Sequence, residues 1–192
     1  MRTSTRSDVD PFIVMDIMEA ARAAEAAGRH IIHMEVGQPG TGAPQAATRA
    51  LTEAMKKGPL GYTVALGLPE LRARIARLYG EWYDLDLNPD CVVVTSGASG
   101  VFLLAFNALF DSGDRVGIGA PGYPSYRQIL RALGLQPVDL PTFDINRLQP
   151  VPADFAGLDL AGLLVASPAN PSGTMLDMSA MRALVDATQE TG

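Results

Sequence analysis

A run of small residues near the middle of the chain has the types and spacing that suit the binding of a phosphate group. Residues 91–94 are mostly β-branched and predict a strand, and residues 96–100 read Ser-Gly-Ala-Ser-Gly before a long apolar segment. This order predicts a strand, a glycine loop and a helix. The two glycines allow a ligand to approach the backbone closely, and the N–H groups of Ala98 and Ser99 would lie at the positive end of the helix. The pattern therefore predicts a phosphate site, although such a turn is also common without a ligand.

Two later loops carry side chains that could bind a planar ring. Residues 121–126 read Pro-Gly-Tyr-Pro-Ser-Tyr and include Tyr123, and residues 169–173 read Ala-Asn-Pro-Ser-Gly and include Asn170. Each loop also has a purely structural interpretation, because proline, asparagine and glycine favour tight turns for local reasons. Together with the phosphate site, however, a flat aromatic and an amide describe a pocket for a planar, phosphorylated, polar ring.

The elements around these loops alternate between strand and helix, which would bring the loops together. After the first loop the pattern predicts strands at 115–119, 136–140 and 162–166, and helices at 123–133 and 179–191. This alternation favours a parallel sheet with helices on both faces. Ligands of such sheets bind at the carboxyl ends of the strands, where residues 96–100, 121–126 and 167–173 would meet.

The N-terminal part of the chain is predicted to be mainly helical. Helical spacing of apolar residues predicts helices at 10–27, 45–57 and 69–82, and a short strand at 31–36 leads into a glycine-rich loop at 37–42. A second glycine-rich loop occupies residues 58–67.

Composition excludes several classes of function. The chain has 192 residues, of which 47% are hydrophobic and 19% charged, as expected for a globular domain or part of a larger one. A net charge of −6 without a basic patch argues against nucleic acid, and the longest apolar run, at 101–106, is too short to cross a membrane. One cysteine, Cys91, expected in the core, and no secretory signal favour a cytoplasmic location. His30 and His33 are the only histidines, and no cysteine or acidic cluster joins them, so no metal site is expected.

Taken together, five motifs make the chain resemble the class I/II aminotransferases, which are pyridoxal-phosphate enzymes of fold type I. The resemblance spans residues 13–192 and rests on the segments 36–40, 61–72, 95–100, 121–126 and 169–173. It implies an α/β fold with three α/β/α layers and a mostly parallel, incomplete sheet, plus the N-terminal part of a small domain. Residues 1–44 would form an N-terminal arm and small-domain segment, and residues 45–192 part of the large cofactor-binding domain.

The resemblance also assigns roles to individual residues. The backbone of Gly97, Ala98 and Ser99 would hold the phosphate of pyridoxal 5'-phosphate, Tyr123 would stack on its ring, and Asn170 would hydrogen-bond its phenolic oxygen. Such stacking holds a flat ring without disturbing its electrons, and a neutral amide favours the phenolate.

Further roles follow for the remaining motifs. Tyr62 would reach the cofactor phosphate of a neighbouring subunit, which implies a homodimer, and Gly37 would lie beside the carboxylate of an amino-acid or 2-oxo-acid substrate. The peptide bond between Asn170 and Pro171 would be cis, as it is in relatives.

The sequence contains no lysine in a position to form the imine that a transaminase needs. Lys56 and Lys57 are its only lysines, and both end a predicted helix, where cations favour the helix dipole. In the family the Schiff-base lysine, the acid below the ring nitrogen and the carboxylate-binding arginine all follow later. The chain is therefore expected to be an N-terminal half that holds no catalytic residue, is inactive alone and is marginally stable.

Alternative functions remain open at this point. A C–S lyase or related lyase shares these loops, and some transcription regulators carry an aminotransferase-like sensor domain, although only about ten residues precede the first helix and the charge is acidic. A decayed gene product without activity is a third alternative. The sequence does not indicate which amino acid is the substrate. The candidate peripheral contacts, which also fit ordinary surface charges, are Glu25, Glu35, Arg127 and Arg131.

Overall fold

The computed structural model describes residues 3–190 and divides the chain into two compact units. The first unit comprises residues 1–16 and 99–192, and the second comprises residues 17–98. The predicted end of the last helix near residue 191 lies outside the described residues. The predicted domain boundary between residues 44 and 45 stays a prediction.

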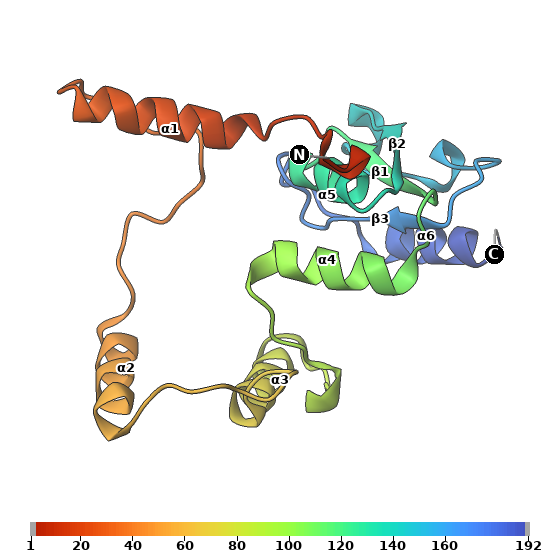
Figure 1. Cartoon of the computed structure of the whole chain (residues 1–192). Helices are drawn as coiled ribbons and strands as arrows, with labels where there is room; N and C mark the ends of the chain where they lie inside the picture. The colour runs from red at the N-terminus through yellow and green to blue at the C-terminus, as the bar shows by residue number, and fades with distance from the viewer. Residues whose placement is uncertain (1–2, 191–192) are drawn as a thin grey trace. The chain divides into compact units, whose positions relative to one another are not determined.

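The first unit contains a parallel sheet (Figure 1). Within the described residues its strands are β1 (Arg115–Ala120), β2 (Gln136–Pro141) and β3 (Gly162–Leu164), in the order β2-β1-β3. Both pairings are parallel, with Arg115 opposite Gln136 and Val116 opposite Gly162. The three strands predicted after residue 115 are therefore confirmed, although β3 ends two residues earlier than expected.

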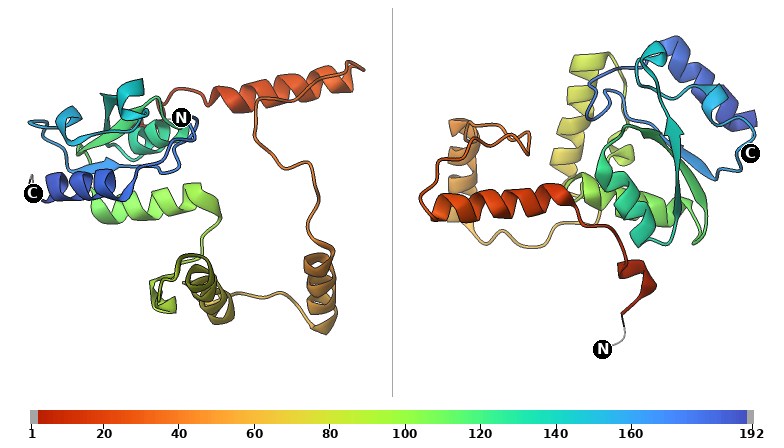
Figure 2. Two further views of the ribbon diagram at one scale, coloured as in Figure 1. Left: turned by 180° about the vertical axis from the view of Figure 1, so that it is seen from behind. Right: turned by 90° about the horizontal axis from the view of Figure 1, so that it is seen from above.

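Helices cover both faces of this sheet, because alternate residues of β1 point to opposite sides. Val116 and Ile118 pack with Phe106 of α4 (Gly97–Leu109) and Leu130 of α5 (Pro124–Ala132). On the other face, Leu140 and Phe155 pack with Leu184 of α6 (Met178–Glu190). A Cβ on Gly117 would lie 3.0–3.2 Å from leucine side chains of that second face, so the strand has little room there. The predicted three-layer α/β/α arrangement is confirmed (Figure 2).

Short 3-10 helices complete the first unit. They are η1 (Thr5–Ser7), η3 (Asp144–Asn146) and η4 (Pro152–Asp154). The last two lie in the connection between β2 and β3.

Helices and long loops make up the second unit. α2 (Gln45–Lys57) has the predicted bounds, α3 (Pro69–Tyr83) is one residue longer than predicted, and η2 (Pro89–Cys91) follows. α1 (Ile13–Ala26) begins two residues after Pro11, the predicted first helical residue. Its first four residues belong to the first unit and the rest to the second. Arg72 of α3 stabilises the segment after η2, because its Nε donates to the Val92 carbonyl oxygen at 2.8 Å.

Two predicted strands of this part are wrong. Residues 31–36 form no strand. Cys91 is the last residue of η2, and residues 92–94 pair with no strand among the described residues. In the second segment, the backbone N–H of Val94 donates to the Leu66 carbonyl oxygen at 3.0 Å, which is a loop contact. β-branched residues favour an extended backbone, but a strand also needs a neighbour to pair with.

The expectation that Cys91 lies in the core is also wrong, because its side chain is exposed. Among the described residues of the second unit, the buried hydrophobic side chains are Ala76 and Val92, whereas Met34, Leu51, Met55 and Trp82 are more than half exposed. Apolar periodicity predicted the helices correctly, but it does not determine what covers their apolar faces.

Candidate functional site

The glycine loop opens α4 as predicted. The helix begins at Gly97, whose φ of +78° is a left-handed value that glycine adopts without strain. The Thr95 hydroxyl donates to the Gly97 carbonyl oxygen at 2.9 Å, which fixes the turn that enters the helix. Because Ala98 and Ser99 lie in the first turn, their N–H groups have no acceptor within the helix. No acidic side chain lies in this turn, so its positive potential is not neutralised locally.

The second loop follows the carboxyl end of β1. Tyr123 precedes α5 as its N-cap residue, and its ring contacts the ring of Tyr126 edge-to-face with 5.4 Å between the centroids. Phe102 of α4 contacts Tyr126 from another direction at 5.2 Å, and Phe12 contacts Tyr123 at 6.1 Å. Edge-to-face contacts of this kind hold rings in defined orientations. Burial raises the pKa of the Tyr126 hydroxyl, and Tyr123 adds to this effect.

Backbone crowding makes Gly122 of this loop indispensable for its shape. A Cβ placed on Gly122 would lie 2.4 Å from the Gly119 carbonyl oxygen, closer than any side chain can approach. The chain therefore turns sharply after β1, and this turn places Tyr123 beside the strand end.

The third loop follows β3 and carries Asn170, whose side chain is exposed. The Ala169 N–H donates to the Thr174 carbonyl oxygen at 2.9 Å, and the Gly173 N–H donates to the Ala169 carbonyl oxygen at 2.7 Å. These bonds close the loop on itself. The peptide bond between Asn170 and Pro171 is cis, which confirms the prediction from the resemblance.

The loops after β1 and β3 meet around one small cavity. Its volume is about 30 Å³, and its walls come from both loops, from α5 and from the connection before η4. The lining residues are Gly119, Pro121, Gly122, Tyr126, Leu148, Gln149, Pro150, Leu164, Val165, Ala166, Ala169 and Asn170. A cavity of this size holds about one water molecule, so a planar ring does not fit inside it. The candidate site is instead the exposed surface beside it.

The structure thus brings several predicted residues to one end of the sheet. Asn170 and Tyr126 line the same cavity, Tyr123 contacts Tyr126, and Ser99 lies one helical turn before Phe102, which also contacts Tyr126. The Asn170 amide makes no hydrogen bond with any residue that the structure describes, which leaves its donor and acceptor groups for a ligand.

Gln149 is a residue of this region that the sequence did not reveal. It is 3% exposed and lines the cavity beside Asn170. The only signal in the sequence was a polar residue between Leu148 and Pro150 in an apolar stretch. Such a residue is buried only when it finds hydrogen-bond partners, and these come from distant parts of the chain.

Two other predicted site residues belong to the second unit. Tyr62 lies in the loop between α2 and α3 with a fully exposed ring, and Gly37 lies in the exposed loop after residues 35–36. The N–H of Gln38 donates to the Val36 carbonyl oxygen at 3.0 Å, so the backbone turns tightly at Gly37.

The second unit also contains a histidine held by two carboxylates. The Nδ1 atom of His33 lies 2.6 Å from an oxygen of Glu35, and its Nε2 atom lies 3.0 Å from an oxygen of Glu25. A carboxylate only accepts hydrogen bonds, so both ring nitrogens donate and the ring is cationic. The hydrogen bonds to Glu35 and then Glu25 raise the pKa of His33 to about 9. No group of three or more metal-binding side chains occurs among residues 3–190.

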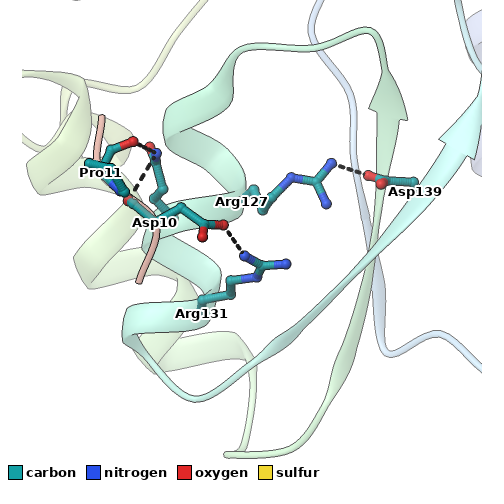
Figure 3. A network of polar contacts seen from close by, with 6 residues as sticks. Asp10, Pro11, Arg127, Arg131 and Asp139 are labelled. Atoms are coloured by element: carbon teal, nitrogen blue, oxygen red, sulfur yellow. Dashed lines mark hydrogen bonds and ion pairs between the residues drawn. The ribbon is translucent and has the colours of Figure 1, made fainter. Parts of the chain in front are cut away.

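The candidate peripheral arginines are engaged in ion pairs of the first unit (Figure 3). Arg131 pairs with Asp10 at 2.5 Å, and Arg127 pairs with Asp139. The amide of Gln128 donates to the carbonyl oxygens of Asp10 and Pro11, so the segment before α1 lies against α5. Both lysines end α2, where Lys56 pairs with Glu53 at 2.7 Å on the exposed surface.

The chain is similar to known proteins in sequence and in structure. A family model described as aminotransferase class I and II matches residues 29–192. The valine–pyruvate aminotransferase of Mycobacterium tuberculosis is 44% identical over 192 residues, which cover 97% of this chain and 50% of that protein. No helix within the described residues is long and apolar enough to span a membrane.

Solved structures match over a similar share of their length. One from Silicibacter pomeroyi is 71% identical with a TM-score of 0.89, over 100% of this chain and 49% of that one. The aspartate aminotransferase of Thermotoga maritima is 30% identical with a TM-score of 0.89, over 99% and 52%. The chain spans about half the length of the curated relatives it matches. Its sequence, its parallel sheet and the family match agree, and the chain belongs to the class I and II aminotransferases.

Proposed function

We propose that this chain supplies the cofactor-binding part of an aminotransferase that uses pyridoxal 5'-phosphate to transfer an amino group between an amino acid and a 2-oxo acid. The observation that carries the proposal is the meeting of the loops after β1 and β3 around Tyr126 and Asn170, with Phe102 of α4 in contact with Tyr126. Membership in the family supports the choice of cofactor.

The donor set suits the phosphate of this cofactor. The N–H groups of Gly97, Ala98 and Ser99 lie at the start of α4, and hydrogen bonds from N–H groups at a helix start to a phosphate dianion are favourable. The first turn carries no acidic side chain that would repel the anion.

Two side chains would hold the ring. Tyr123 would stack on its face, in an orientation supported by the ring of Tyr126. Asn170 would donate to the phenolic oxygen, where a neutral donor stabilises negative charge without neutralising it. When bound, pyridoxal phosphate supplies a conjugated ring that accepts the electron pair released at the substrate α-carbon.

The second unit would contribute to substrate binding and to a neighbouring subunit. The turn at Gly37 would lie beside the substrate carboxylate, and the exposed Tyr62 would reach the phosphate in a homodimer. Neither lysine is suited to hold the cofactor, because Lys56 and Lys57 lie on the exposed end of α2. We therefore propose that residues 1–192 alone do not catalyse transamination.

A test of this function uses the full-length protein with valine and pyruvate, the pair named for the M. tuberculosis relative. We expect alanine to form from pyruvate only when an amino donor is present. Asn170→Ala should lower kcat/KM about tenfold or more, as the loss of a preorganised donor typically does. Asn107→Ala, on the exposed side of α4, serves as the matched control. Release of ammonia from an amino acid without any 2-oxo acid would instead indicate a lyase.

A further inference from the structure

Gln149 is a deeply buried polar side chain next to the loop that carries Asn170. It lies between η3 and η4, in the connection from β2 to β3, and only 3% of it is exposed. Burying an amide is unfavourable unless its groups are hydrogen-bonded, so its partners explain why it is there.

The partners are the two ends of the Asn170 loop. The Gln149 Nε2 atom donates to the Thr174 carbonyl oxygen at 2.8 Å and to the Ala166 carbonyl oxygen at 3.2 Å. The Thr174 hydroxyl lies 3.3 Å from the same nitrogen. An amide nitrogen carries two hydrogens, so one side chain can serve both carbonyl groups at once. Residues 166 and 174 flank the loop, and Gln149 therefore joins its beginning to its end.

The bonds inside the loop depend on the same atoms. The Thr174 carbonyl oxygen also accepts the Ala169 N–H at 2.9 Å, and the Ala169 carbonyl oxygen accepts the Gly173 N–H at 2.7 Å. A single carbonyl group thus connects Gln149 to the residue that precedes Asn170. Since the Asn170 side chain has no partner of its own among the described residues, the loop backbone determines the point from which its amide reaches a ligand.

We propose that Gln149 is a positioning residue for the cofactor site: it closes the loop of residues 166–174 from behind and thereby holds the Asn170 amide in place for the ring of the cofactor. The role of Asn170 rests on the proposed function, whereas the closing of the loop by Gln149 does not. The two are therefore tested by separate measurements.

The first measurement is hydrogen exchange of the backbone amides in the chain of 192 residues without any ligand. Gln149→Met keeps the length of the side chain but removes both donors, and exchange at residues 167–174 should become about tenfold faster. Gln128→Met is the matched control, because that amide also donates to two backbone carbonyls, those of Asp10 and Pro11, and it should leave the loop unchanged. Exchange of β1 amides reports the stability of the sheet.

A second variant keeps the test decisive if Gln149→Met unfolds. In Gln149→Glu the ionised side chain accepts but does not donate, so it repels the carbonyl oxygens of Ala166 and Thr174. Once protonated it has one donor again. Relative to the wild type at the same pH, the loop should therefore keep its protection at low pH and lose it as the pH rises through the titration of the new carboxyl group. A role in volume alone would give a difference from the wild type that does not depend on pH.

The second measurement is the dissociation constant of pyridoxal phosphate for the chain of 192 residues, determined by equilibrium dialysis. We expect about tenfold weaker binding in Gln149→Met and in Asn170→Ala, and no further loss when the two are combined, because Gln149 acts through Asn170. Unchanged exchange at residues 167–174, an equal rise at β1, or additive losses in the double variant would overturn the proposal. Faster loop exchange with an unaltered dissociation constant in Asn170→Ala would overturn the proposed cofactor role and leave the loop closure intact.

Discussion

Close backbone contacts, rather than bulky side chains, determine the shape of the site at the level of single residues. Gly122 has no space for a side chain, and the loop at Asn170 is held by hydrogen bonds to carbonyl groups. Substitutions that alter these backbone contacts should therefore have larger effects than their small size suggests.

Replacement of Gly122 by alanine tests this directly. The new Cβ would lie 2.4 Å from the Gly119 carbonyl oxygen, so the turn after β1 must shift. We expect the free energy of unfolding to fall by about 1–3 kcal/mol, as in other overpacked sites. Urea unfolding followed by circular dichroism measures it.

The matched control is Gly119→Ala, three residues earlier. Its Cβ would lie 3.7 Å from Thr142 and 3.8 Å from Pro150, which are ordinary contacts. A loss as large as that of Gly122→Ala would show that the close approach at Gly122 is not the cause.

His33 gives a prediction for the pH dependence of the second unit. Its pKa of about 9 exceeds the ordinary value of 6.5, so the ion pairs with Glu35 and Glu25 stabilise the folded chain fully below pH 6.5. This contribution is lost as the pH rises from 6.5 through about 9. An NMR titration of the His33 ring should have its midpoint near 9.

Removing one carboxylate at a time identifies the cause of that shift. The hydrogen bond to Glu35 is the larger contribution to the raised pKa of His33, so Glu35→Gln should lower the midpoint more than Glu25→Gln. A midpoint that stays the same in both variants would contradict the geometry around His33.

At the level of elements, the arrangement follows from the way each helix buries one face. Leu130 of α5 is fully buried between Phe106 and Val116, whereas Leu109 at the end of α4 is 71% exposed. The two leucines have the same chemistry, so their difference measures what packing against the sheet contributes.

We therefore predict different costs for Leu130→Ala and Leu109→Ala. The first removes core volume and should lower the free energy of unfolding by about 2–5 kcal/mol. The second should change it by less than about 1 kcal/mol, because Leu109 is exposed and surface substitutions have small effects. Chemical denaturation of both variants under one set of conditions provides the comparison, and equal losses would contradict the assignment of the core.

The spacing of apolar residues predicted the helices, and the alternation of strands and helices along the chain predicted the parallel sheet. The alternation from residue 115 onwards gave all three strands, and α2 was predicted with its observed bounds. The strands predicted at 31–36 and 91–94 are absent because β-branched content does not supply a pairing partner. The burial of Gln149 could not be predicted for a similar reason, because its hydrogen-bond partners at residues 166 and 174 are distant in sequence.

For the whole molecule, the important fact is that the chain spans about half the length of its curated relatives. Many large apolar side chains of the second unit are exposed, among them Ile32, Met34 and Trp82. Where such side chains form one patch, that patch usually marks a contact with other protein surface.

The two lysines provide a test of the proposed inactivity of residues 1–192. After addition of pyridoxal phosphate and borohydride, mass spectrometry should find no stoichiometric adduct on this chain, because Lys56 and Lys57 are exposed and lie on α2. A stoichiometric adduct on either lysine, together with transamination of valine and pyruvate, would refute the proposal.

The most direct test of the cofactor site is hydrogen exchange of the chain with and without pyridoxal phosphate. We expect the ligand to slow exchange in three segments, at residues 97–100, 121–126 and 167–173, and Asn170→Ala to weaken this protection. Protection confined to the end of α2, or spread over segments that exclude all three loops, would contradict it.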